Sequence, residues 1–109
     1  MNVTFLPLDT RVASVDSTMV TVWEKYNHAH IVVYAPAVNG FTVAVKGRAA
    51  GVDFPILSTN IVASGTTVMK IGPEYTAGAN IAKDTVPYNF YVSVTASGSN
   101  TYSIGGSIE

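Results

Sequence analysis

Two histidines in the first third of the chain are its only candidates for imidazole chemistry. His28 and His30 form a His-x-His pair, and along a strand the side chains at positions i and i+2 share one face, so both rings could ligate one metal. A closed metal site needs a third and a fourth ligand, and Glu24 is the only acidic residue close by in the sequence. We interpret the pair as polar residues at the start of a strand, and predict no metal and no cofactor.

The acidic residues show no catalytic pattern. A glycosidase needs two carboxylates on facing elements, whereas carboxylates beside turns usually serve local hydrogen bonding. Nucleophilic catalysis by a serine would need one of the two histidines, and no spacing supports such a pair. The chain also lacks a nucleophile elbow, a Walker loop, a dinucleotide fingerprint and zinc-ligand spacing. We therefore predict no catalytic residue and a protein that is not an enzyme; the acidic residues beside turns or strand ends are Asp9, Asp16, Glu24, Asp53, Glu74 and Asp84.

Length and charge narrow the class of protein. The 109 residues predict one domain spanning 1–109. The absence of cysteine excludes disulfides and thiolate metal sites. A net charge of −1 gives no electrostatic footprint for nucleic acid or an anionic membrane. No apolar run approaches the roughly 20 residues of a membrane span, and the N-terminus does not resemble a signal peptide. We expect no nucleic-acid partner and no membrane partner.

The low charge content is the unusual figure. Charged residues make up 12% of the chain, hydrophobic residues 48%, and the mean hydropathy is +0.30, whereas an ordinary soluble domain carries about 25% charged residues. Part of the surface must then be apolar or neutral and polar, and such patches mark contacts with partners. A monomer kept wet by Ser, Thr and Asn is the alternative. We favour a homo-oligomer, a dimer or trimer, or a component of an assembly.

Strand-like segments recur every 8 to 12 residues or so with turn residues between them, which is typical of a sandwich or barrel. Pro55 predicts an edge or bulged strand, because proline cannot donate to a ladder. Residues 74–86 read as a long loop, in which only 77–84 could form a helical turn. The prediction is an all-β, antiparallel two-sheet β-sandwich, jelly-roll-like, with about 8 strands and little or no helix. The expected strands are 3–8, 11–15 (the weakest), 19–24, 30–35, 41–46, 53–58, 66–71, 88–95 and 101–104.

Alternation within these segments predicts which side chains face the core. Phe41, Val43 and Val45 share one face of their strand. Tyr88, Phe90, Val92 and Val94 share a face of another, opposite Tyr91. Asn39-Gly40 separates two alternating segments and predicts a β-hairpin with a type I′ turn, because both central residues of that turn need positive φ.

The candidates for partner contact are apolar residues of the N-terminal segment and aromatic residues that could be exposed. The segment 1–10 is a possible N-terminal arm, because Phe5, Leu6 and Leu8 around Pro7 would make a poor free tail and proline favours strand addition. An ordinary first strand is the alternative. Trp and Tyr dominate binding hot spots, although we favour a core position for Trp23, and some tyrosines could fill the core as well. The candidate interface residues are Phe5, Leu6, Leu8, Trp23, Tyr26, Tyr34 and Tyr91.

Residues 30–109 resemble the head decoration, or cement, proteins of tailed bacteriophages. The resemblance lies mainly in the segments TVMKIGPEYTA and VPYNFYVSVTASGS, the second followed by TYSIGGSI; the first 29 residues do not share it. It implies a compact β-sandwich on the outer capsid surface of the virion, made in the host cytoplasm and bound to the major capsid protein as a dimer or trimer. It carries over no functional site. The alternative is a receptor- or carbohydrate-binding module of a phage fibre or adhesin.

Overall fold

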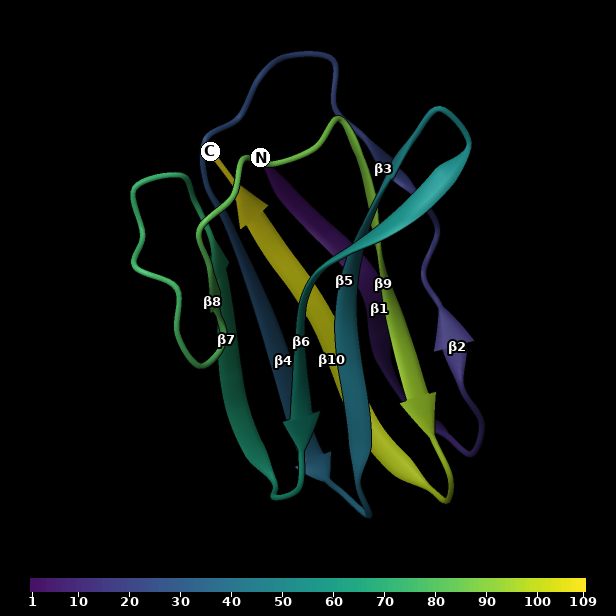
Figure 1. Ribbon diagram of the computed structural model, residues 1–109. Coiled ribbons are helices and arrows are strands. Elements are labelled where there is room, and N and C mark those ends of the chain that lie inside the picture. Colours follow the sequence, from purple (N-terminus) through teal and green to yellow (C-terminus); the bar gives the residue numbers. More distant parts are fainter.

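Alternating apolar residues build two sheets that pack face to face in the computed structural model, which describes residues 1–109 (Figure 1). Sheet A has the strand order β1-β10-β4-β7-β8, and sheet B has the order β2-β9-β5-β6 with β3 also paired to β9. All pairs are antiparallel except β7 with β8. The strands are β1 (Asn2–Arg11), β2 (Val15–Asp16), β3 (Val20–Thr21), β4 (Ala29–Ala37), β5 (Phe41–Ala49), β6 (Val52–Ile61), β7 (Gly65–Ile71), β8 (Ile81–Ala82), β9 (Asn89–Ala96) and β10 (Asn100–Ile108).

This architecture confirms the all-β sandwich without helix. Ten strands form where about eight were expected. Three of the ten, β2, β3 and β8, are only two residues long. The weak strand predicted for 11–15 does not form: β1 continues to Arg11, and β2 begins at Val15. The expected loop 74–86 contains β8, whose two residues pair in parallel with Lys70 and Ile71 of β7.

The core lies between the sheets and follows the predicted alternation. Phe41, Val43 and Val45 point inward from β5, where sheet B packs against sheet A. Phe90, Val92 and Val94 do so from β9. Tyr88 was expected on the same face, but β9 begins at Asn89 and Tyr88 stays exposed before it. The largest fully buried side chains of sheet A are Ile31, Val33, Met69, Ile71, Tyr102, Ile104 and Ile108.

The Asn39-Gly40 hairpin prediction is wrong. β4 pairs with β10 and β7 in sheet A, whereas β5 pairs with β6 and β9 in sheet B, so Asn39-Gly40 carries the chain from one sheet to the other. The backbone N–H groups of Asn39 and Gly40 both donate to Oδ1 of Asn100, at 2.7 and 3.0 Å. Asn100 is buried, and its amide replaces the ladder bonds that a hairpin would have made.

The type I′ geometry occurs instead at Ala50-Gly51, between β5 and β6. Ala49 pairs with Val52, which leaves a two-residue loop. Both loop residues have positive φ, 52° at Ala50 and 75° at Gly51, as a type I′ turn requires. Alanine rarely adopts this conformation because its Cβ crowds the following carbonyl. The residue type at position 50 therefore gave no turn signal.

Prolines shape two of the sheet edges. Pro55 lies in β6, the edge strand of sheet B, and a register shift falls beside it between Val45 and Lys46 of β5, which confirms the predicted edge or bulge. The expected strand 30–35 stops before Pro36, but β4 continues through this proline to Ala37. Pro7 lies within the register shift between Leu6 and Asp9 of β1, the edge strand of sheet A.

The N-terminal segment is not a free arm in this structure. β1 pairs with β10 along almost its whole length, from Asn2 opposite Ser107 to Arg11 opposite Asn100. Phe5 and Leu6 are buried in the core, where the Phe5 ring lies 5.9 Å from that of Phe90. The alternative, an ordinary first strand of the same domain, matches this arrangement.

We expect Ala50→Asn to stabilise the protein, because asparagine tolerates positive φ better than alanine and Asn-Gly is a preferred type I′ pair. The gain should be about 0.5–1 kcal/mol, or a rise in Tm of about 3–6 °C for a domain of this size. Thermal unfolding followed by circular dichroism measures it. Ala49→Asn is the control, since Ala49 is a strand residue and should gain nothing. A Tm for Ala50→Asn at or below that of the parent protein would contradict the turn assignment.

Candidate functional site

The two histidines hold a loop rather than converge on a metal. Nε2 of His28 contacts Oε1 of Glu74, and Nε2 of His30 lies 3.2 Å from the Tyr75 hydroxyl. Glu74 and Tyr75 belong to the loop between β7 and β8, so each histidine binds that loop to the start of β4. No group of three or more His, Cys, Asp or Glu side chains lies together. The histidine pair is thus accounted for by contacts within the fold.

The seven candidate interface residues do not form one surface. The expectation that Phe5 and Leu6 face a partner is wrong, because both fill the core. Leu8 and Tyr34 are exposed on sheet A. The Tyr26 ring packs against the core, and its hydroxyl donates to Oε1 of Glu24 at 3.1 Å.

The solvent exposure of Trp23 and of Tyr91 could not be predicted from their being aromatic residues. Trp23, for which a core position was favoured over partner contact, is 92% exposed just after β3. Tyr91 points away from the core but is only 7% exposed, and it contacts Arg48 and Asp53 on the outer surface. Trp23 is therefore the most solvent-exposed aromatic residue of the chain, and Tyr91 belongs to a polar cluster.

The outer face of sheet A is almost free of charge. Its central row runs from Val68 of β7 through Val32 of β4 and Gly105 of β10 to Thr4 of β1, in direct register. Val32, Val68 and Tyr34 are all exposed. By strand alternation, Lys70 is the only residue with a formal charge among those that β10, β4 and β7 direct outward. We call this surface face A: Thr101, Ser103, Gly105, Ser107, His30, Val32, Tyr34, Pro36, Thr66, Val68 and Lys70.

The outer face of sheet B carries the charges instead. Lys46, Arg48 and Asp53 point outward from its strands, and Asp16 joins from β2, where it accepts a 2.6 Å hydrogen bond from the Ser93 hydroxyl. The remaining outward positions are mostly hydroxyl and amide side chains. We call this surface face B: Tyr91, Ser93, Thr95, Thr42, Ala44, Lys46, Arg48, Asp53, Pro55, Ser58 and Asn60.

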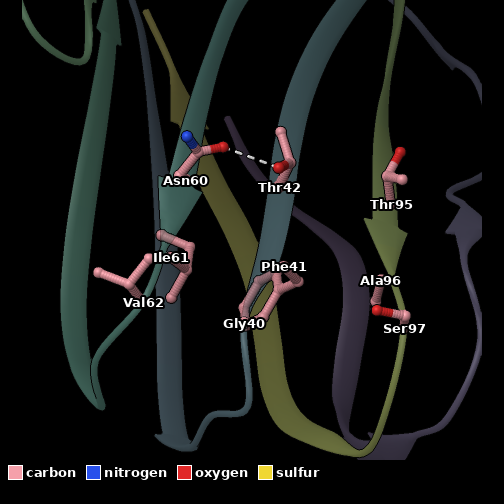
Figure 2. A pocket seen from close by; sticks show the side chains of 9 residues that line it. All are labelled: Gly40, Phe41, Thr42, Asn60, Ile61, Val62, Thr95, Ala96 and Ser97. Atoms are coloured by element: carbon pink, nitrogen blue, oxygen red, sulfur yellow. Dashed lines mark hydrogen bonds between the residues drawn. The ribbon is translucent and has the colours of Figure 1, made fainter.

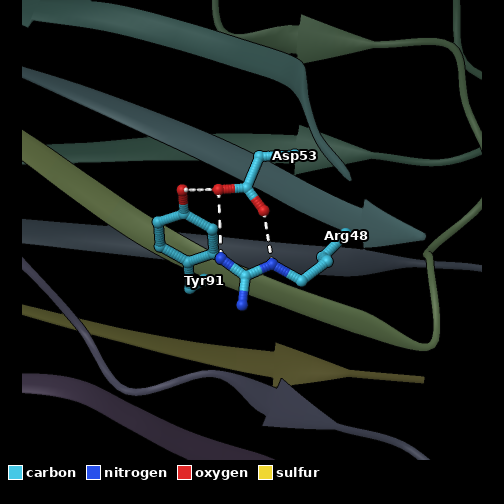
Figure 3. Close-up of polar contacts among 3 residues, drawn as sticks. All are labelled: Arg48, Asp53 and Tyr91. Atoms are coloured by element: carbon cyan, nitrogen blue, oxygen red, sulfur yellow. Dashed lines mark hydrogen bonds and ion pairs between the residues drawn. The ribbon is translucent and has the colours of Figure 1, made fainter. Parts of the chain in front are cut away.

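Three side chains of face B form one hydrogen-bonded cluster (Figure 3). Arg48 and Asp53 are opposite each other next to the Ala50-Gly51 turn. Arg48 Nε and Nη2 donate to Asp53 Oδ1 and Oδ2 at 2.5 and 3.1 Å. The Tyr91 hydroxyl donates to Asp53 Oδ2 at 2.8 Å, and the guanidinium carbon lies 6.0 Å from the centre of the Tyr91 ring. The cluster ties β5, β6 and β9 together at one end of sheet B.

These contacts displace the pKa values of all three groups. Hydrogen bonds from Arg48 and then Tyr91 lower the pKa of Asp53 below its ordinary value of 3.8. The same bonds raise the pKa of the Tyr91 phenol and of the Arg48 guanidinium, because each donates to a carboxylate. The carboxylate therefore stays ionised and the phenol protonated throughout the neutral range.

Two hollows lie on face B, one at each end. The first, of about 280 Å³, lies beside the cluster, and its lining includes Asp16 and Met19. The second, of about 370 Å³, lies at the opposite end of the strands (Figure 2). There Thr42 Oγ1 donates to Asn60 Oδ1 at 2.8 Å. Both hollows have hydroxyl, amide or charged side chains in their lining, which are groups that hydrogen-bond ligands.

Sequence reasoning missed the cluster, although one signal was present. Arg48 and Asp53 have opposite charge and flank Ala-Ala-Gly-Val. A two-residue turn at Ala50-Gly51 places them directly across the hairpin, where opposite charges attract. Tyr91 could not be added from the sequence, because its place depends on the pairing of β5 with β9.

Asp53→Asn should lower Tm at pH 7, and the difference from the parent protein should shrink under acid conditions. Because the folded pKa of Asp53 is depressed, its contribution to stability is present above its ordinary pKa of 3.8 and is lost as pH falls below that value. Thermal unfolding from pH 7 down to about pH 2.5 tests this. Asp84→Asn serves as an exposed control and should leave Tm nearly unchanged. A difference for Asp53→Asn that persists at the lowest pH would refute the linkage.

Comparison with known families and curated proteins does not assign a function to the chain. No model of a known protein family matches the chain, and no curated protein matches it. The structure contains no helix of the length and hydropathy needed to cross a membrane. The two contrasting outer faces are thus the features from which a function has to be inferred.

Proposed function

We propose that this protein is a non-enzymatic structural protein of a virion that decorates the outer capsid shell. In this proposal face A docks onto the major capsid protein and bridges neighbouring subunits. The carrying observation is the row Val68, Val32 and Gly105 on face A, where Lys70 is the only formal charge among the outward residues of β10, β4 and β7. Interface cores are depleted in charged residues and enriched in tyrosine, as Tyr34 beside this row would provide.

Face B is the less suitable docking surface. Lys46, Arg48, Asp53 and Asp16 would lose their hydration against a partner, and that cost is recovered only if the partner supplies matching groups. On face A only Lys70 would need such a match. A cement protein also gains affinity by touching several shell subunits at once, so each contact can be small. With face A on the shell, face B points to solvent.

Trp23 supports a binding role. It follows β3 on the segment whose Val22 N–H donates to the carbonyl of Tyr88, so two exposed aromatic residues lie on neighbouring segments there. A fully exposed tryptophan resembles a single anchor, because burying 150–250 Å² of aromatic surface is worth roughly 4–6 kcal/mol. Such an anchor fits a protein partner.

The open edge of β7 gives the dimer a physical basis. The Lys70 N–H points away from β4, at the edge of the sheet, and donates to Asn80 O at 2.8 Å. Strand alternation directs the N–H and C=O groups of Thr66 and Val68 to the same edge. β8 reaches only Lys70 and Ile71, so the edge is open at Thr66 and Val68. The other edges are two residues long or are interrupted by proline and register shifts, which are known protections against edge pairing.

Antiparallel pairing of β7 with β7 of a second copy would satisfy these groups. A two-fold axis at Thr67 sets Thr66 opposite Val68 of the other copy, and the reverse pair follows by symmetry. Sheet A then continues from one copy into the other, and the two copies of face A lie side by side. A dimer built this way would present a wider uncharged surface to the shell.

Val32→Glu should weaken shell binding by more than about tenfold, because the new carboxylate would be buried unpaired in the interface. The measurement is cosedimentation with capsid shells that lack this protein. The shells are assembled from the major capsid protein that the same genome encodes. Ala44→Glu is the matched control, since it places the same charge at the centre of face B and should bind as the parent does. Equal binding by both variants, or loss only with Ala44→Glu, would contradict docking through face A.

Val68→Pro should shift the protein toward monomer, because it removes an N–H from the open edge while leaving the β4 ladder intact. Val68→Ala is the control: it shortens the side chain but keeps the N–H, and should retain the dimer. Analytical ultracentrifugation over a range of concentrations gives the mass. A trimer, or a parent protein that stays monomeric at all concentrations, would rule out the β7 dimer.

A further inference from the structure

A second binding surface lies in the hollow beside Arg48, Asp53 and Tyr91 on face B. The hollow measures about 280 Å³, and its opposite wall is the chain from Asp16 to Met19. It lies on the outer face of sheet B, with the core between it and face A. A ligand could therefore occupy it whether or not face A is covered.

The polar groups around the hollow have unused hydrogen-bonding capacity of both kinds. Arg48 uses Nε and Nη2 on Asp53, whereas Nη1 makes no hydrogen bond within the chain, and Figure 3 shows it on the side away from the carboxylate. Asp16 accepts from Ser93 through Oδ1 only, so Oδ2 can accept another bond. A free donor and a free acceptor on one hollow suit a hydroxyl group, which both donates and accepts.

The net charge of the hollow favours a neutral ligand. Arg48 lines the hollow with one positive charge, and Lys46, which is outside the lining but paired with Tyr91 in the register of β5 and β9, adds a second beside it. Asp16 and Asp53 line the hollow with two negative charges, so the lining and the neighbouring lysine together sum to zero. An anion would face two carboxylates and a cation would face the guanidinium and the ammonium group, so electrostatics selects against both.

The cluster is preorganised, which lowers the entropy cost of binding. Asp53 accepts two bonds from Arg48 and one from Tyr91, and Tyr91 is almost fully covered. Met19 adds an apolar, adaptable side chain to the lining. The volume lies just under the roughly 300–1,000 Å³ of pockets for drug-sized ligands. The hollow therefore has room for about one small ring.

From the cluster, the charge balance and the size, we infer that this hollow binds a single neutral pyranose. Arg48 Nη1 would donate to one hydroxyl and Asp16 Oδ2 would accept from another, with a C–H face of the ring against Met19. Asp53 and Tyr91 act as positioning residues, because they hold the guanidinium. The inference is independent of the docking role of face A.

Titration of the ¹⁵N-labelled protein with the methyl glycosides of glucose, galactose, mannose and N-acetylglucosamine tests the inference. At least one should shift the amide signals of Ser17 and Tyr91 and the Arg48 Nε–H signal in a saturable way. N-acetylneuraminic acid and glucosamine are the anionic and cationic probes and should bind more weakly. No saturable shift with any neutral glycoside, or binding of only a charged probe, would overturn the inference.

Arg48→Lys separates a sugar site from a merely structural ion pair. The lysine keeps the charge beside Asp53 but lacks the free planar donor, so affinity for the neutral glycoside should fall about tenfold or more. Asn60→Ala, in the second hollow of face B, is the matched control and should bind as the parent does. Val32→Glu should also keep the sugar affinity, which distinguishes this inference from shell docking. Unchanged affinity in Arg48→Lys would overturn it.

Discussion

Burial of every second residue on β4, β5, β9 and β10 is the constraint from which the other features follow. Those inward side chains form one core, with Ile31, Val43, Val92 and Ile104 fully buried. Once the core is fixed, strand alternation also fixes which residues form each outer face. The outer faces contribute little to the core and are free to differ. One is neutral and partly apolar, whereas the other holds the charged cluster and both hollows.

Local patterns predicted the strands well because periodicity and turn residues act over a few neighbours. They did not predict which strands pair. Asn39-Gly40 has the strongest hairpin signal, yet it links the two sheets because Asn100 satisfies its backbone from a strand 60 residues away. The true two-residue hairpin uses Ala50, whose side chain disfavours the conformation it adopts. Pairing of β4 with β7 and β10 instead of β5 is decided by the core, to which residues distant in sequence contribute.

The candidate site was predicted only in part for the same reason. Tyr34 and Leu8 are exposed, as an interface would require, but Phe5 and Leu6 belong to the core, and only the pairing of β1 with β10 shows this. The polar cluster depends on the register of three strands, with Arg48 opposite Asp53 and Lys46 opposite Tyr91. Single-residue properties such as aromaticity cannot separate Trp23, almost wholly exposed, from Tyr91, almost wholly covered.

The central claim is that the neutral sheet face is covered by a larger partner while the charged face remains in solvent. Hydroxyl-radical footprinting of the shell-bound and the free protein tests it most directly, because the reactivity of a tyrosine or methionine side chain reports its solvent exposure. The account predicts that Tyr34 on face A becomes protected on the shell, while Met19 beside the face B hollow keeps its reactivity. Protection of Met19 with Tyr34 still reactive would contradict it.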